Sequence, residues 1–389
     1  MRAAIISLFM CALGYASDRA TQVRLTRVPE GGLQPQVAVD SKGAVHLIYF
    51  KGDPKQGDVY YARSVDGGTT FQAPIRVNSQ AGSAIAIGTI RGPQMALGKA
   101  DRVYVVWNGS AIAEPKSPPN AVTGQPGSPM LFTRLNDEGT EFEPQRNLMQ
   151  RTYGLDGGGS VAADRFGRVY VGWHGKTKGD AEGEAGRAVW IARSDDEGKT
   201  FTPEARAWNE PVGACGCCGM RLFADRNGTV YALFRSATKN VHRDIYLLVS
   251  KDHGKSFRGT LLQRWEINAC PMSSMSFAEE AGSVVAAWET QGQVFYARID
   301  PDRPENAQPV APPGPAGNRK HPIVAAGLKG EVVLVWAEGT GWQRGGSLSW
   351  QVFDERGGPL GEHGTAAGIP AWSFASAFLS PRGTDVVIY

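Results

Sequence analysis

The sequence predicts an all-β protein, a β-propeller of four-stranded blades, because it contains two internal repeats. The first repeat is a short turn motif in which Gly follows Asp by two residues and Phe follows by five; its copies are Ser64–Phe71, Leu135–Phe142, Ser194–Phe201 and Ser250–Phe257. The second is a pair of apolar strands joined by a polar turn, with copies at Pro35–Phe50, Pro93–Trp107, Val161–Trp173, Met220–Phe234, Met272–Trp288, Pro322–Trp336 and Trp372–Tyr389. Repeats of about 50 residues that hold four short strands each are typical of propellers.

The turn motif has a clear local chemistry. Its four aspartates are Asp66, Asp137, Asp196 and Asp252. A short Asp side chain accepts hydrogen bonds from the backbone N–H groups just ahead of it, and Gly supplies a positive φ without steric cost. The Phe then anchors the returning strand in the core. We therefore expect these aspartates to be structural and not catalytic.

The order of the repeats predicts how the ring closes. Third strands such as Ala188–Arg193 and Asp244–Ser250 follow the hairpins, and the turn motif then leads into a fourth strand. The chain ends two strands into its seventh unit, and Thr21–Pro29 reads as a lone strand that could complete that blade and cover its open edge. We predict seven blades, with six as the alternative, in a single domain over residues 17–389.

The N-terminus reads as a secretory signal, which predicts an exported protein, periplasmic or secreted. Arg2 precedes the apolar run Ala3–Leu13, and Gly14-Tyr15-Ala16 fits a small-x-small cleavage site, so residues 1–16 are the expected signal peptide. A buried N-terminal helix is the alternative. The apolar run is too short to cross a bilayer comfortably, and no later stretch is longer, so we expect no membrane span.

The charge balance argues against a nucleic-acid partner. Lys and Arg number 41 against 38 Asp and Glu, which leaves no basic footprint. The partner classes that remain are a carbohydrate or another small-molecule ligand, or a second protein.

Four cysteines form the least ordinary feature of the chain. Cys215, Cys217 and Cys218 open the fourth unit, and Cys270 opens the fifth. Cys215 lies 19 residues after Asp196 and Cys270 lies 18 residues after Asp252, so we expect them at equivalent places in adjacent blades, with all four sulfur atoms meeting near the central funnel.

Three interpretations of these cysteines remain open at this point. In an exported protein four cysteines normally form two disulfides. Cys217 and Cys218 are neighbours, about 3.8 Å apart at Cα, so pairing one with Cys270 and the other with Cys215 is less strained. The second interpretation is a soft-metal site, for copper or zinc, because thiolates and thioethers favour such ions. The other candidate ligands are Met220, Met272, Met275 and His321. The third is a reactive thiol.

The turn motif resembles the Asp box of the sialidase (neuraminidase) superfamily. In that family the boxes are structural turns at the blade periphery, and the propellers have six blades. The segment from Cys215 to Pro271 also resembles a group of exported bacterial Asp-box proteins with a Cys-x-Cys-Cys motif. The resemblance implies a substrate carboxylate held by three arginines, a Tyr–Glu nucleophile pair and an Asp acid/base.

The catalytic residues of the family cannot be assigned in this chain. The family's first arginine belongs to an Arg-Ile-Pro motif in the first inner strand, where this chain has Leu33-Gln34-Pro35. The nearest match, Arg91-Gly92-Pro93, lies one blade later. The residues expected to line the funnel are Arg91, Arg221, Arg319, His321 and Glu289. Two functions follow: a binding or scaffold propeller with a cysteine-rich funnel site, or a glycoside hydrolase of exo-α-sialidase type with a divergent active site.

Overall fold

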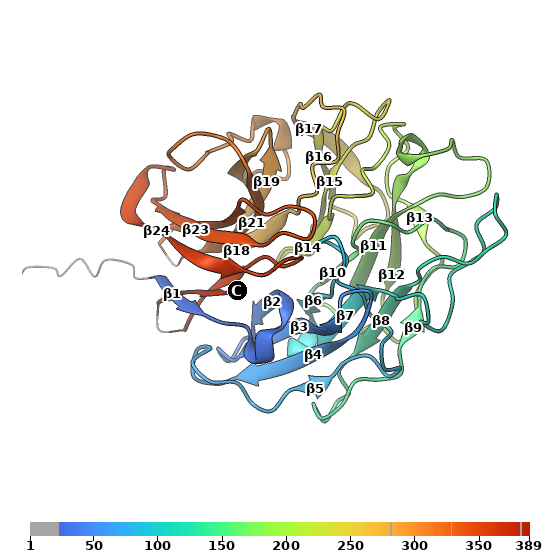
Figure 1. The fold of residues 1–389 in the computed structure, drawn as a ribbon, viewed down its shortest axis with the longest axis horizontal. Helices are drawn as coiled ribbons and strands as arrows, with labels where there is room; N and C mark the ends of the chain where they lie inside the picture. The colour runs from blue at the N-terminus through green and yellow to red at the C-terminus, as the bar shows by residue number, and fades with distance from the viewer. Residues whose placement is uncertain (1–22, 281, 328, 382) are drawn as a thin grey trace, which may run out of the picture.

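The computed structural model describes residues 23–280, 282–327, 329–381 and 383–389, and their strands form seven sheets arranged in a ring (Figure 1). The first four sheets, blades 1 to 4, are β2 (Leu33–Val39), β3 (Val45–Asp53), β4 (Gln56–Ser64) and β5 (Ile75–Arg76); β6 (Gln94–Leu97), β7 (Val103–Asn108), β8 (Met130–Arg134) and β9 (Arg146–Asn147); β10 (Ser160–Ala163), β11 (Val169–Gly175), β12 (Ala188–Ser194) and β13 (Ala205–Arg206); β14 (Arg221–Ala224), β15 (Val230–Arg235), β16 (Ile245–Ser250) and β17 (Arg258–Gln263).

Blades 5 to 7 are β18 (Ser276–Glu280), β19 (Ser283–Thr290) and β20 (Gln293–Ile299); β21 (Arg319–Ala326), β22 (Val332–Glu338), β23 (Gly346–Phe353) and β24 (Pro359–Ile369); β25 (Ser376–Leu379), β26 (Asp385–Ile388) and β1 (Val23–Thr26). The helices of the described residues are single 3-10 turns at η1 (Pro29–Gly31), η2 (Lys99–Asp101), η3 (Glu184–Gly186) and η4 (Pro304–Asn306). The first strand of each blade lies near the centre of the ring and the last lies at its rim (Figure 1).

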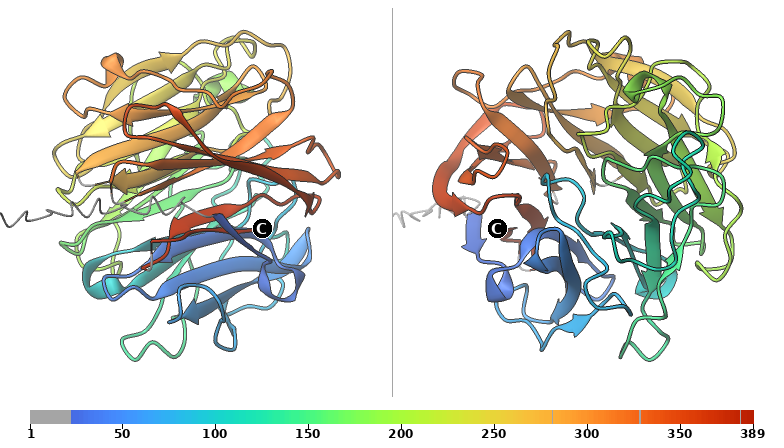
Figure 2. Two further views of the ribbon diagram at one scale, coloured as in Figure 1. Left: turned by 90° about the vertical axis from the view of Figure 1, so that its left-hand side faces the viewer. Right: turned by 45° about the vertical axis from the view of Figure 1, so that its right-hand side comes forward.

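The prediction of seven blades is confirmed, and the six-blade alternative is wrong. The N-terminal strand β1 joins the last blade, pairing in parallel with β26 from Val23 opposite Asp385 to Thr26 opposite Ile388. Figure 2 shows this blue strand beside the red C-terminal strands. The pairing covers an edge that β26 would otherwise expose. The predicted signal peptide lies outside the described residues.

Two blades have three strands instead of the expected four. Blade 7 consists of β25, β26 and β1. In blade 5 the outermost strand is reduced to a single bridge between Tyr296 and Val310. The chain around Val310 is rich in proline, which cannot donate to a strand ladder, so a longer fourth strand cannot form there.

The hydrophobic core is divided among the contacts between neighbouring blades. Each of its seven clusters combines residues of two adjacent sheets, and the last joins Phe378 and Val386 of blade 7 to Val45 and Leu47 of blade 1. The aromatic residues that end the second strands are fully buried in these clusters, as Trp107, Trp173 and Trp288 are. Stability therefore depends on an unbroken ring.

Three of the four Asp-box turns share one hydrogen-bond pattern. In the third copy the Asp196 carboxylate accepts hydrogen bonds from Thr200 N (2.9 Å), Thr200 Oγ1 (2.6 Å) and Ser194 Oγ (2.7 Å). Asp66 and Asp252 accept the corresponding bonds in their own turns. Burial raises the pKa of Asp196, but these hydrogen bonds outweigh it and lower the pKa to about 2.

In the second copy the acceptor is not the aspartate that the repeat predicts. There Asn136, and not Asp137, accepts the backbone N–H groups of Thr140 (2.9 Å) and Glu141 (3.3 Å). The Asp137 side chain is 77% exposed and pairs with Arg102. The turn is one residue out of register with the other three, so the expected structural role of Asp137 belongs to its neighbour.

Replacing Asp196 by alanine is expected to lower the free energy of unfolding by about 1–2 kcal/mol, because three donors lose their acceptor. Urea unfolding followed by circular dichroism measures the change. Asp137→Ala is the matched control, with an expected change within about 0.5 kcal/mol. Equal losses in the two variants would contradict the assignment of the turns.

Candidate metal-binding site

The three neighbouring cysteines lie in one turn, residues 213–219, which we call the thiol turn. It connects the rim of blade 3 to the first strand of blade 4, so it lies on the face of the ring where the innermost strands begin. The Asp-box turns join third and fourth strands and therefore lie on the opposite face. The backbone of the thiol turn is held at three points. Ala214 N donates to Glu184 O (3.1 Å), Cys215 N donates to Arg235 O (2.9 Å) and Gly219 N donates to Ser273 O (2.9 Å).

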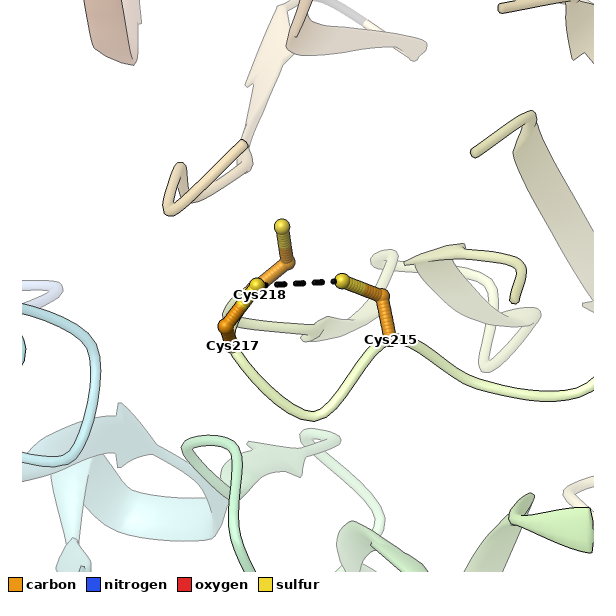
Figure 3. A group of neighbouring side chains, drawn as sticks. All are labelled: Cys215, Cys217 and Cys218. Carbon is orange, nitrogen blue, oxygen red and sulfur yellow. Dashed lines mark hydrogen bonds between the residues drawn. The ribbon is translucent and has the colours of Figure 1, made fainter. Parts of the chain in front are cut away.

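The turn brings three sulfur atoms together. The Sγ atoms of Cys215, Cys217 and Cys218 all lie within 4.8 Å of one another, and those of Cys215 and Cys217 are 3.4 Å apart. Figure 3 shows the three side chains on the same side of the turn. Cys215 and Cys218 are fully buried, whereas Cys217 is partly exposed and gives the group a route to solvent.

Charged side chains surround the thiol turn closely. Glu184 Oε1 accepts a hydrogen bond from Gly216 N (2.5 Å), and its other oxygen pairs with Arg243 Nη1 (2.7 Å). Arg187 pairs with Asp156 Oδ2 (3.4 Å) beside the turn. Behind Cys215, the side chains of Arg235 and Glu289 form a buried ion pair at 3.0 Å.

This environment favours one thiolate in the group. Burial opposes ionisation of Cys218, but hydrogen bonds from the thiols of Cys215 and Cys217, together with the charge of Arg235, outweigh it and hold the pKa of Cys218 well below its usual value. The pKa of Cys217 is raised by its hydrogen bonds to the other two sulfur atoms and by burial. The negative charge is therefore concentrated on the sulfur of Cys218.

The donor set fits a thiophilic metal ion. A metal–sulfur bond of about 2.3 Å places the sulfur atoms of a three-coordinate site roughly 4 Å apart, within the separations seen here. Three sulfur donors suit Cu(I) or Zn²⁺. Binding an ion would require the remaining thiols to lose their protons, and the nearby arginines would offset part of the resulting charge.

Cys270 does not join this group, and the expectation that four sulfur atoms meet is wrong. All four described cysteines are free thiols, and Cys270 is exposed, so neither predicted disulfide is formed. The physical reason is the path of the chain: residues 268–270 are all exposed, and the backbone turns inward only at Pro271. Cys270 is therefore on the surface, although it holds the same place in its repeat as the buried Cys215.

The methionines and the histidine expected beside the cysteines line other cavities on the same face. Met272 and His321 share a cavity with Trp342 and Trp372. The His321 ring lies 3.1 Å from Ser274 Oγ, and burial lowers its pKa to about 3. Met220 lines an axial cavity to which all seven blades contribute.

The three candidate arginines are each engaged by different partners. Arg91 donates to Asp156 Oδ1 (2.6 Å) and to the backbone oxygen of the same residue. Arg221 lines the axial cavity and donates to Gln36 Oε1 (2.7 Å), while Arg319 pairs with Glu338 Oε1 (3.2 Å). Among the residues that the structure describes, no hydrogen-bond partner is shared by any two of these arginines. Glu289, the remaining funnel candidate, is buried in its pair with Arg235.

Sequence analysis missed several residues around the thiol turn. Glu184 and Arg187 come from the connection between β11 and β12. Only the length and polarity of this connection indicated that it could lie over one face of the ring. His174 on β11 carried no signal at all, because its neighbours in the strand are ordinary core residues. Burial, followed by the charge of Arg187, lowers the pKa of His174 to about 4, so the ring is neutral at pH 7.

The fold and the site together define a class: a seven-bladed β-propeller with a thiol turn on the face where its inner strands begin. Among the described residues no helix has the length and apolar composition to cross a membrane. No protein-family model matches the chain, and no curated protein shows significant similarity to its sequence.

Solved structures share the fold at low sequence identity. A protein of unknown function from Dyadobacter fermentans has a TM-score of 0.57 and 14% identity, over 85% of this chain and 96% of that one. An α-L-arabinanase from Penicillium chrysogenum, in complex with arabinobiose, has a TM-score of 0.55 and 15% identity, over 85% and 95% of the two chains. A leech intramolecular trans-sialidase has a TM-score of 0.54 and 13% identity, over 90% and 70%. At these identities the likeness concerns the fold alone.

Proposed function

We propose that this chain is an exported, sialidase-like β-propeller that binds a thiophilic metal ion, Cu(I) or Zn²⁺, at the thiol turn and acts as a binding protein. The observation that carries the proposal is the approach of three sulfur atoms to within 4.8 Å of one another in one buried turn. Export is supported by the composition of residues 1–16.

The surroundings of the turn support a binding role. Its backbone is fixed to three different segments, so the sulfur atoms are held in place before an ion arrives. Cys217 is the partly exposed member and would meet the ion first, whereas Cys215 and Cys218 would hold it away from water. The Glu184 carboxylate fixes the middle of the turn through Gly216 N.

Cys217→Ser is expected to weaken metal binding by at least about 100-fold, because it removes one of three sulfur donors. The measurement is competition for Cu(I), and separately for Zn²⁺, against a chromophoric chelator with the reduced protein under nitrogen. The wild-type chain is expected to bind one ion. Cys270→Ser is the matched control, because it removes an exposed thiol outside the group, and its affinity should equal that of the wild type.

Two results would count against this proposal. Equal affinities for wild type and Cys217→Ser would remove the thiol turn as the site. Release of sugar from fluorogenic sialosides, abolished in Arg91→Ala, would favour the second function, a glycoside hydrolase of exo-α-sialidase type. We favour binding because Arg91, Arg221 and Arg319 are occupied by separate protein partners.

A further inference from the structure

His174 carries a deeply buried imidazole. Its side chain is 0% exposed, and neither Nδ1 nor Nε2 is hydrogen-bonded within the part of the chain that the structure describes. The two other deeply buried histidines differ, since His46 contacts Asp40 and Tyr61, and His321 contacts Ser274. A buried polar group without a partner is costly and normally marks a bound water, a bound ion or a functional role.

The ring faces the thiol turn across a glycine. A Cβ atom placed on Gly157 would lie 3.0 Å from His174 Nδ1, 2.9 Å from Cys218 O and 3.0 Å from Gly216 O. Even a methyl group would be crowded here, so the glycine allows the imidazole and the backbone oxygens of the turn to lie close to one another. Any larger residue at this position would push the two apart.

We infer that His174 supplies a nitrogen donor to the ion bound at the thiol turn, so that the complete donor set is three sulfur atoms and one nitrogen. The inference rests on the proposed function and names the coordination of the same site. Three thiolates and one imidazole form a tetrahedral set that is characteristic of Zn²⁺. Cu(I), in contrast, is satisfied by the three thiolates alone.

Some movement is needed to complete the set. His174 is not part of the group whose ligand atoms lie within 4.8 Å of one another, so the imidazole has to shift toward the turn when the ion binds. The backbone hydrogen bonds of Ala214, Cys215 and Gly219 keep the turn in place, so the shift falls on the imidazole.

The test compares two metals in two variants. His174→Leu keeps a buried side chain of similar size but removes both nitrogens; we expect the affinity for Zn²⁺ to fall at least about 100-fold, because a ligand is lost, and the affinity for Cu(I) to stay within about threefold. Gly157→Ala retains every ligand residue but pushes the ring and the turn apart, so it should also weaken Zn²⁺ binding. His363→Leu, which alters an exposed histidine, is the control and should change neither affinity.

Absorption spectroscopy of the Co²⁺-bound protein provides a second test of the same site. In wild type it should show sulfur-to-metal charge transfer together with the strong d–d absorption of a four-coordinate ion. In His174→Leu the charge transfer should remain while the d–d absorption changes. X-ray absorption of the wild-type Zn²⁺ complex should show three sulfur atoms and one nitrogen, a result that does not depend on whether a variant folds.

The outcomes separate the two proposals. Wild-type charge transfer with unchanged Zn²⁺ affinity and d–d absorption in both variants would overturn the role of His174 and leave metal binding by the thiols intact; a buried water would then be its partner. Four sulfur atoms in the X-ray absorption spectrum, or three sulfur atoms with a light ligand that lacks the outer-shell scattering of an imidazole, would overturn it as well. No charge transfer in the wild type would remove both proposals.

Discussion

Replacing Arg235 by leucine is expected to lower the free energy of unfolding by about 3–5 kcal/mol, the usual loss when one partner of a buried ion pair is removed. The Arg235 side chain is 0% exposed and that of Glu289 is 1% exposed. Arg235 also donates to the backbone oxygen of Arg243 (2.8 Å) and stacks over Trp265. Leucine would leave the Glu289 carboxylate buried without its counter-ion.

The loss should depend on pH in a definite direction. Burial raises the pKa of Glu289, and Arg235 opposes that increase, so removing Arg235 raises the pKa further. A carboxyl group whose pKa is raised by folding destabilises the fold as pH rises through that pKa. The Arg235→Leu variant should therefore differ less from wild type at pH 5 than at pH 8.

Urea unfolding, followed by circular dichroism at both pH values, measures these differences. The double variant Arg235→Leu with Glu289→Leu removes both charges and should be more stable than Arg235→Leu alone. Lys51→Ala is the control for an exposed pair, since Lys51 lies 2.6 Å from Glu30 with both side chains about half exposed, and its expected change is within about 0.5 kcal/mol. If Arg235→Leu were as stable as the double variant, the ion pair would not be the source of the loss.

Replacing Asp385 by asparagine is expected to stabilise the protein at pH 8 by about 2–4 kcal/mol. Asp385 is the first residue of β26, lies between Val23 of β1 and Leu379 of β25, and is 3% exposed. Its Oδ1 atom has no hydrogen-bond partner among the described residues. Burial, followed by the charges of Glu331 and Glu362, raises its pKa to about 7.

The sign of this effect follows from the direction of the pKa shift. The folded protein holds the proton more tightly than the unfolded chain, so wild-type stability falls as pH rises from about 4 to about 7. Asparagine does not titrate, so the advantage of the variant should grow over that range and disappear near pH 4. Chemical unfolding at pH 4, 6 and 8 measures it. Asp53→Asn, at an exposed position, should show no such trend, and an equal trend in both variants would contradict the assignment to Asp385.

Local sequence signals predicted the blades well because their chemistry is local. The Ser194, Asp196 and Thr200 side chains make their turn with one another, so their spacing alone predicts it. The same reasoning failed at Asp137, where Asn136 is an equally good acceptor one residue earlier. Alternating strands and polar turns likewise predicted hairpins, which involve residues close together in the chain.

Contacts between distant segments could not be predicted in the same way. The pairing of β1 with β26 joins residues more than 360 positions apart, and only the leftover half-unit at the C-terminus suggested it. Cys270 shares its place in the repeat with Cys215, yet it is exposed, because the direction of a connecting segment depends on what packs against it.

The all-β class, the repeat that builds the blades and the proximity of Cys215, Cys217 and Cys218 follow from local sequence, since residues 215–218 are consecutive and cannot lie far apart. The tertiary structure alone decided what surrounds those sulfur atoms. Glu184, Arg243 and His174 come from different strands and connections, and they meet at the thiol turn only because adjacent blades pack around a closed ring. Burial and charge at the site are properties of that packing, so no local pattern in the sequence could have shown them.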